Sequence, residues 1–115
     1  MVVEDEVLVR MIIADRLRDA GYSVIEATNA HEALEALALL GSGVNVVVSD
    51  IEMPGAMDGM ALARTIRAEH PAIKIVLTSG HSLAIGVDDA SACDGFFSKP
   101  YDMAQLLRQI QTLLD

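Results

Sequence analysis

The stretch NVVVSDIEMPG, residues 45–55, decides the fold of this chain. Three consecutive valines predict a strand that is buried on both faces, as in a parallel sheet covered by helices. The run nevertheless ends on Asp50, with Glu52 and a Met-Pro-Gly turn directly after it. A buried strand that carries a carboxylate to its end indicates a site, so residues elsewhere in the chain must complete it.

Composition limits the classes to which the protein can belong. The chain has 115 residues, 52% of them hydrophobic, which predicts one folded domain with an aliphatic core. A net charge of -9 argues against nucleic acid or an anionic membrane as a direct partner. Cys93 is the only cysteine, which excludes an internal disulfide and favours a cytoplasmic location. Abrupt ends lead us to expect that residues 1–115 are one domain excised from a longer protein.

Short β-rich runs alternate five times with helical patterns. Strands are expected at residues 2–3, 23–27, 44–49, 73–79 and 95–98. Helices are expected at residues 7–20, 30–40, 60–69, 83–91 and 103–114. Strict alternation predicts an α/β fold, a doubly wound parallel sheet with helices on both faces.

Local signals refine two of the helices. The first helix is expected to bury an apolar stripe that consists of Leu8, Met11, Ile12, Ala14 and Leu17. Asn29 predicts the N-cap of the second helix, and Glu32 predicts its capping-box partner.

Polar residues follow four of the five strands. The strand ends carry Glu4-Asp5, Asp50, Thr78-Ser79 and Lys99-Pro100. Ligands of such sheets bind at the carboxyl ends of the strands, at the point where the strand order reverses. In the order 2-1-3-4-5 that point lies between strands 1 and 3, which brings the acidic residues together.

The charge at this edge requires a counterion. Glu4, Asp5 and Asp50 sum to -3 and Lys99 returns +1. Two carboxylates about 5 Å apart repel by about 3 kcal/mol at an effective dielectric constant near 20. Mg²⁺ binds through carboxylates, waters and a phosphate, so the charge predicts a metal and a phosphoryl group. Each pair alone could be a helix-start charge or a turn residue, but their meeting at one edge favours a functional site.

Five motifs in order make the chain resemble a known family. They are VVEDE (2–6), VVVSDIEMPG (46–55), MDG (57–59), LTSG (77–80) and FFSKP (96–100). The set resembles the receiver domain of two-component response regulators, and it covers essentially the whole chain. The resemblance implies a single (βα)5 domain with the flavodoxin-like strand order 2-1-3-4-5.

The resemblance also implies roles for the residues at the edge. Asp50 would be the phosphoacceptor, which takes a phosphoryl group from the phosphohistidine of a histidine kinase or phosphotransfer domain. Glu4, Asp5, Asp50 and the backbone carbonyl of Glu52 would hold Mg²⁺ or Mn²⁺. Lys99 would pair with the phosphoryl oxygens, and the Lys99–Pro100 peptide bond would be cis.

A switch is implied as well. Ser79 or Thr78 would turn its hydroxyl toward the phosphoryl group; Ser79 is preferred because the small Gly80 follows it. Phe96 would follow that movement and change the face formed by the fourth helix, fifth strand and fifth helix. A homodimer through that face is compatible with the resemblance. Glu52 and His81 are either exposed loop residues or rim residues that set the lifetime of the phosphoryl bond.

Three functions compete at this stage. A phosphoacceptor signalling module, not an enzyme of ordinary turnover, accounts for every motif. A receiver-shaped binding module that is not controlled by phosphorylation would leave Asp5, Asp50 and Lys99 without a task. An aspartyl-nucleophile phosphatase would use Asp50-Ile51-Glu52 but needs a cap domain, for which 115 residues leave no room.

Overall fold

The structure is a computed structural model that describes residues 1–80 and 92–115. Its strands are β1 (Val2–Val3), β2 (Glu26–Ala27), β3 (Val46–Asp50), β4 (Lys74–Ser79) and β5 (Gly95–Ser98). Its helices are α1 (Val7–Asp19), α2 (Ala30–Leu40), α3 (Gly59–Glu69) and α5 (Met103–Leu114), with a 3-10 turn η1 at Gly41–Gly43. The helix expected at 83–91 lies outside the described residues. None of the described helices combines the length and hydrophobicity that crossing a bilayer would require.

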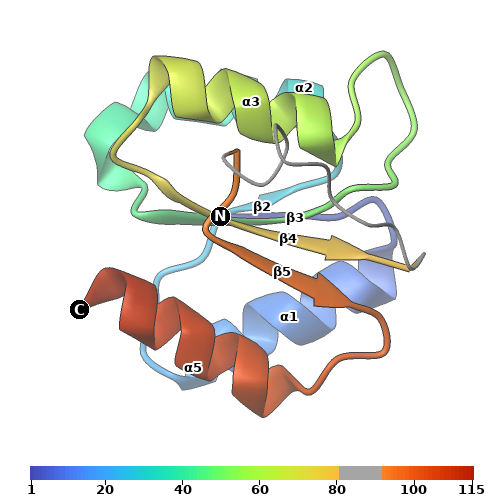
Figure 1. The fold of residues 1–115 in the computed structure, drawn as a ribbon, viewed down its shortest axis with the longest axis vertical. Helices are drawn as coiled ribbons and strands as arrows, with labels where there is room; N and C mark the ends of the chain where they lie inside the picture. The colour runs from blue at the N-terminus through green and yellow to red at the C-terminus, as the bar shows by residue number, and fades with distance from the viewer. Residues whose placement is uncertain (81–91) are drawn as a thin grey trace.

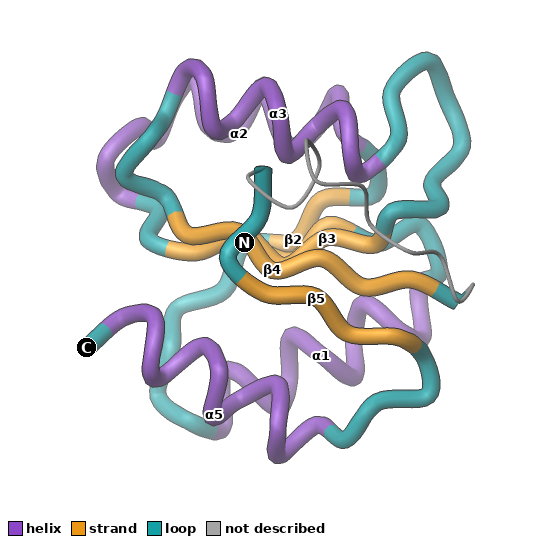
Figure 2. The backbone as a smooth tube through the Cα atoms, in the orientation of Figure 1, coloured by secondary structure: helices purple, strands orange, loops and turns teal. Residues whose placement is uncertain are grey.

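The five strands are parallel and lie in the order β2-β1-β3-β4-β5, which confirms the expected order. Figure 1 shows α2 and α3 over one face of the sheet and α1 and α5 over the other. Figure 2 shows the strands as one twisted layer between these two pairs of helices. Val47 packs with the α2–α3 side and Val48 with the α1–α5 side, so β3 is buried on both faces as its valines predicted.

The buried face of α1 differs from the expected stripe. Ala14 and Leu17 are buried as expected, together with Ile13. Large apolar residues on the other side of the helix are exposed, namely Val7 (56%), Leu8 (74%), Met11 (47%) and Ile12 (58%). The expectation was wrong for Leu8, Met11 and Ile12, because α1 carries two apolar stripes and only the one with Ile13 faces the sheet.

Two further boundaries differ from those expected. The second strand is Glu26–Ala27 and not residues 23–27, because its partner β1 pairs over Val2 and Val3 alone. The third strand begins at Val46 and includes Asp50, whereas residues 44–49 were expected. The sheet therefore carries Asp50 within its hydrogen-bonded ladder, where it pairs with Thr78 of β4.

The start of α2 shows how the expected cap forms. Asn29 Oδ1 accepts a hydrogen bond from the Glu32 amide at 2.8 Å, as expected of an N-cap. Glu32 Oε1 accepts from the Thr28 amide at 3.0 Å and not from that of Asn29, so the reciprocal bond is shifted by one residue. Both contacts satisfy amides that the helix itself leaves unpaired.

Candidate functional site

Three carboxylates meet where β1 and β3 end. Glu4 and Asp5 follow β1 and Asp50 is the last residue of β3, and each offers an oxygen within 4.8 Å of the others. Glu4 and Asp50 are buried, whereas Asp5 is exposed. The structure thus brings together the acidic residues that the strand ends predicted.

Lys99 lies against two of these carboxylates. Its Nζ is 3.2 Å from Asp50 Oδ2 and 3.7 Å from Glu4 Oε2. Burial alone lowers the pKa of Lys99, but the charges of Glu4 and Asp50 outweigh it and the pKa is raised. The ammonium therefore stays charged, and one cation faces three carboxylates.

The two buried carboxylates resist ionisation. Burial, and next the charge of Asp50, raise the pKa of Glu4 from 4.5 to about 7. Burial also raises the pKa of Asp50, although Lys99 opposes it. Asp50 Oδ1 is buried and has no hydrogen-bond partner among the described residues.

This donor set fits a hard divalent cation. A buried carboxylate oxygen without a partner is costly, and metal coordination removes that cost. The ligand atoms are all oxygens and one side of the group, at Asp5, is open to solvent. Mg²⁺ prefers such sites because it keeps several waters.

A second group of residues borders Asp50 at the end of β4. The Ser79 hydroxyl donates a hydrogen bond to Glu52 Oε1, and the Gly80 amide donates to Glu52 Oε2 at 3.4 Å. Burial acts to raise the pKa of Glu52, but the hydrogen bonds that its carboxylate accepts, first of all from the Ser79 hydroxyl and also from the Gly80 amide, outweigh it and lower the pKa to about 2. Glu52 is therefore an anion held beside Asp50.

Sheet register separates the two candidate hydroxyls. Leu77 pairs with Phe96 and packs on the α2–α3 side, so alternation places Ser79 on that same side. Thr78 alternates to the α1–α5 side. Phe96 is partly buried against the α2–α3 core, on the side of the sheet that Ser79 shares.

The loop after β5 has the backbone geometry that the resemblance implied. The Lys99–Pro100 peptide bond is cis. The Lys99 amide donates to the Ser79 carbonyl at 2.7 Å, which ties this loop to the end of β4. His81, the second rim residue expected from the sequence, lies outside the described residues.

Two contributions to the site were not expected from the sequence. Arg10 on α1 donates from Nη1 to the Glu4 carbonyl at 2.9 Å and from Nε to Glu26 at 3.2 Å, which fixes the end of β1. Gly59 begins α3 directly against β3, and a Cβ there would lie 2.0 Å from the Asp50 carbonyl oxygen. No sequence spacing predicts either the Arg10 contact or the close approach of Gly59 to Asp50. The sequence did show that Asp58-Gly59 begins a helix.

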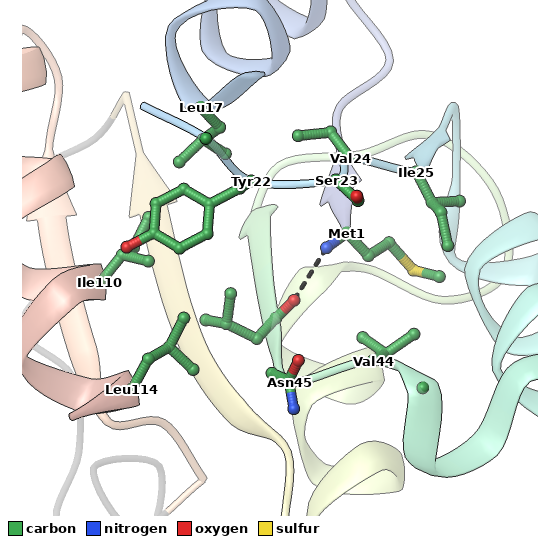
Figure 3. A pocket seen from close by; sticks show the side chains of 13 residues that line it. Met1, Leu17, Tyr22, Ser23, Val24, Ile25, Val44, Asn45, Ile110 and Leu114 are labelled. Carbon is green, nitrogen blue, oxygen red and sulfur yellow. Dashed lines mark hydrogen bonds between the residues drawn. The ribbon is translucent and has the colours of Figure 1, made fainter. Parts of the chain in front are cut away.

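A larger hollow lies at the opposite edge of the sheet but carries no comparable chemistry. It has a volume of about 380 Å³ and is lined by mostly apolar residues that include Leu17, Tyr22 and Ile110. Figure 3 shows the Met1 amine in this hollow, where it donates to the Val46 carbonyl at 2.8 Å. No carboxylate lines it, so the acidic edge and not the larger hollow is the candidate site.

Comparisons with known proteins identify the family of this chain. Residues 1–111 match the model of the response regulator receiver domain. The chain is 40% identical over 117 residues to the sensor kinase CckA of Brucella abortus (strain 2308), covering 100% of this chain and 12% of that protein. It is 33% identical over 113 residues to the DNA-binding transcriptional regulator NtrC of Escherichia coli (strain K12), covering 96% of this chain and 23% of that protein.

A solved structure gives the same result. The response regulator TrrA of Thermotoga maritima, crystallised in complex with Mg²⁺-BeF, superposes with a TM-score of 0.86 at 30% identity. The match covers 98% of this chain and 96% of that chain. By contrast, the chain spans less than a quarter of the curated relatives CckA and NtrC.

Proposed function

The chain belongs to the response regulator receiver family, whose members are phosphoacceptor switches of two-component systems, and we propose that Asp50 is its phosphoacceptor. One observation carries the assignment. Asp50 is a buried carboxylate at the end of a rigid strand, with an unpartnered Oδ1 and with Lys99 on its other oxygen. The domain acts as a signalling module and not as a turnover enzyme.

The proposed step is a transfer of one phosphoryl group. The Asp50 carboxylate attacks phosphorus, and the bond between phosphorus and the imidazole nitrogen of a phosphohistidine breaks, its electron pair staying on that nitrogen. The product is an acyl phosphate on Asp50. Lys99 is placed to pair with the phosphoryl oxygens, because its ammonium already lies 3.2 Å from Asp50 Oδ2.

Mg²⁺ or Mn²⁺ would be held by Glu4, Asp5, Asp50 and the backbone carbonyl of Glu52. When bound, the cation would neutralise the charge that gathers on the phosphoryl oxygens. Arg10 supports this group from outside, since it holds the backbone of Glu4 in place.

Phosphorylation would be read out through Ser79 and Phe96. The Ser79 hydroxyl borders Asp50 and lies on the same side of the sheet as Phe96, whereas Thr78 alternates to the other side. We therefore favour Ser79 over Thr78 as the switch hydroxyl. A shift of Ser79 toward the phosphoryl group would change the packing of Phe96 and the face that β5 and α5 form with the helix expected at residues 83–91. A homodimer through this face is one form that the output could take.

The partner would be a histidine kinase or phosphotransfer domain that docks beside α1. Four large apolar side chains are exposed on this helix, which begins directly after the acidic residues: Val7, Leu8, Met11 and Ile12. A groove of about 300 Å³ continues this surface between α1 and the loop at Lys99. Such a surface suits an apolar helix of a protein partner.

Intact mass after incubation with Mg²⁺ and acetyl phosphate tests the assignment. We expect a gain of one phosphoryl group that is absent without Mg²⁺ and absent in Asp50→Asn. Asp94→Asn is the matched control, since Asp94 is a partly buried aspartate outside the site, and it should still gain the group. A gain in Asp50→Asn equal to that of the wild type would remove Asp50 as the acceptor. If no protein gains mass, binding of beryllofluoride with Mg²⁺ decides whether the acyl phosphate is short-lived or the site does not take phosphate.

A further inference from the structure

The Glu52 side chain already occupies hydrogen-bond donors at the end of β4. One carboxylate oxygen accepts from the Ser79 hydroxyl and the other accepts from the Gly80 amide. Ser79 is fully buried, so its hydroxyl has few alternatives among water molecules. The two hydrogen bonds tie Glu52 to residues that lie 27 and 28 positions further along the chain, at the end of β4.

These donors lie where a phosphoryl group on Asp50 would need them. Asp50 pairs in register with Thr78, so Ser79 and Gly80 lie one and two residues beyond it on the neighbouring strand. Glu52 follows Asp50 by two residues. Its hydrogen bonds to Ser79 and Gly80 require the chain to turn back toward β4 at this point. A carboxylate and a phosphoryl group are both anionic oxygen acceptors, and the same donor cannot serve both fully.

We infer that the Glu52 carboxylate is an internal competitor that fills the phosphoryl subsite in the resting domain and must leave when Asp50 is phosphorylated. The inference rests on the proposed function and deepens it, because it assigns the Glu52 side chain as the group that occupies the phosphoryl subsite before phosphorylation. Phosphorylation then exchanges one anion for another on Ser79 and Gly80. Before the exchange, the Ser79 hydroxyl is held by Glu52.

Charge supports the same conclusion. With Glu52, four carboxylates lie at this edge of the sheet, and among the described residues the Lys99 ammonium is the cation that contacts them, through Asp50 and Glu4. A further anion enters such a site more readily when one of the carboxylates withdraws, since like charges at this spacing repel. Glu52 is able to withdraw because its side chain is only half-buried and borders solvent, unlike Glu4, which is enclosed.

Binding of beryllofluoride in the presence of Mg²⁺, followed by amide NMR, tests the competition. Glu52→Gln keeps the size of the side chain and removes its charge, and Glu52→Ala removes the acceptor as well. We expect both variants to bind beryllofluoride more tightly than the wild type, by roughly tenfold for Glu52→Ala. Glu69→Gln is the matched control, an exposed glutamate at the end of α3, and it should bind as the wild type does.

A second readout needs no ligand. In the free protein, Glu52→Ala should shift the Gly80 amide resonance, because that amide loses its acceptor, whereas Glu69→Gln should leave it unchanged. Equal beryllofluoride affinity in the wild type and Glu52→Ala, or weaker affinity in the variant, would overturn the competition while leaving Asp50 as the acceptor. Absence of binding in every variant would overturn the proposed function, and the competition with it.

Discussion

The two edges of the sheet differ in what their polar groups lack. At the carboxyl edge, buried Asp50 keeps an oxygen without a partner, and one ammonium faces several carboxylates. At the amino edge, the charge of Asp94 is paired: its Oδ2 accepts from the Arg67 guanidinium and from the Ile75 amide, each at 2.8 Å, although Arg67 Nε is buried without a hydrogen-bond partner among the described residues. The amino edge also has the larger hollow, about 380 Å³. The comparison teaches that unsatisfied charge, and not empty volume, locates the site.

Substitution of two glycines, one at each edge, should give the largest difference in the free energy of unfolding. Gly59→Ala would drive a Cβ against the Asp50 carbonyl, and we expect a loss of about 3 kcal/mol in the free energy of unfolding. Gly43→Ala, at the amino edge, meets nothing within 4 Å and should change it by less than about 0.5 kcal/mol. Urea titrations of both variants measure the effect. Equal losses in the two variants would mean that residues at the carboxyl edge are packed no more closely than residues at the amino edge.

Two aspartates should give effects of opposite sign. Asp94→Ala leaves the Ile75 amide and the Arg67 guanidinium without their acceptor, so we expect a loss of about 2 kcal/mol. Asp50→Asn removes a buried charge that the protein satisfies poorly, and should raise stability by about 1 kcal/mol. Thermal unfolding in metal-free buffer gives both values. A lower stability of Asp50→Asn would contradict the view that the buried charge of Asp50 lowers the stability of the fold.

The pH dependence of stability sharpens the comparison further. The pKa of Glu4 is raised to about 7 in the folded protein, so the folded state binds this proton more tightly than the unfolded chain does. Stability without metal should therefore fall by about 1 to 2 kcal/mol as pH rises from about 4.5 to about 7, and this contribution is constant above that range. Glu4→Gln should flatten the profile and Glu69→Gln should not. Mg²⁺ added above pH 7 should restore the lost stability in the wild type.

The smallest stability effect is expected at two exposed leucines. Leu8 on α1 borders the carboxyl edge and Leu39, near the end of α2, lies toward the amino edge; they are 74% and 88% exposed. Leu8→Ser and Leu39→Ser should each change stability by less than about 0.5 kcal/mol. Leu8→Ser alone should slow phosphotransfer from a phosphohistidine protein, while its reaction with acetyl phosphate stays at the wild-type rate. Equal transfer rates in both variants would remove α1 as the docking surface.

The sequence predicted what repeats along the chain, and missed what depends on contacts across it. Valine runs alternating with helical patterns were enough to predict the layers, and the strand order that the resemblance implied predicted the meeting of Glu4, Asp5 and Asp50. The prediction of the buried stripe on α1 was wrong because Leu8 and Ile13 lie on two different apolar faces of one helix. Only packing against the sheet decides which of the two faces is buried. The length of β2 depends on the two residues that β1 offers it.

Side-chain direction in the loops was the other gap. The sequence placed Glu52 at the rim of Asp50, but not its bond to Ser79, which requires the loop after β3 to turn back over the strand. The support of Glu4 by Arg10 likewise depends on the angle at which α1 leaves the sheet. Neither is encoded in a spacing.

The loop after β3 is closed at its base, and this has an evolutionary consequence. The Ile51 amide donates to the Thr78 carbonyl at 2.8 Å, which ties the start of the loop to β4. The Gly59 amide donates to the Ile51 carbonyl at 2.9 Å, which ties the end of the loop to its start. One added residue in such a closed loop costs only on the order of 0.1 kcal/mol in chain entropy. Residues 54–57, between these two ends, are therefore free to lengthen or shorten between lineages and acquire new partners, while Gly59 and Asp50 stay where the site requires them.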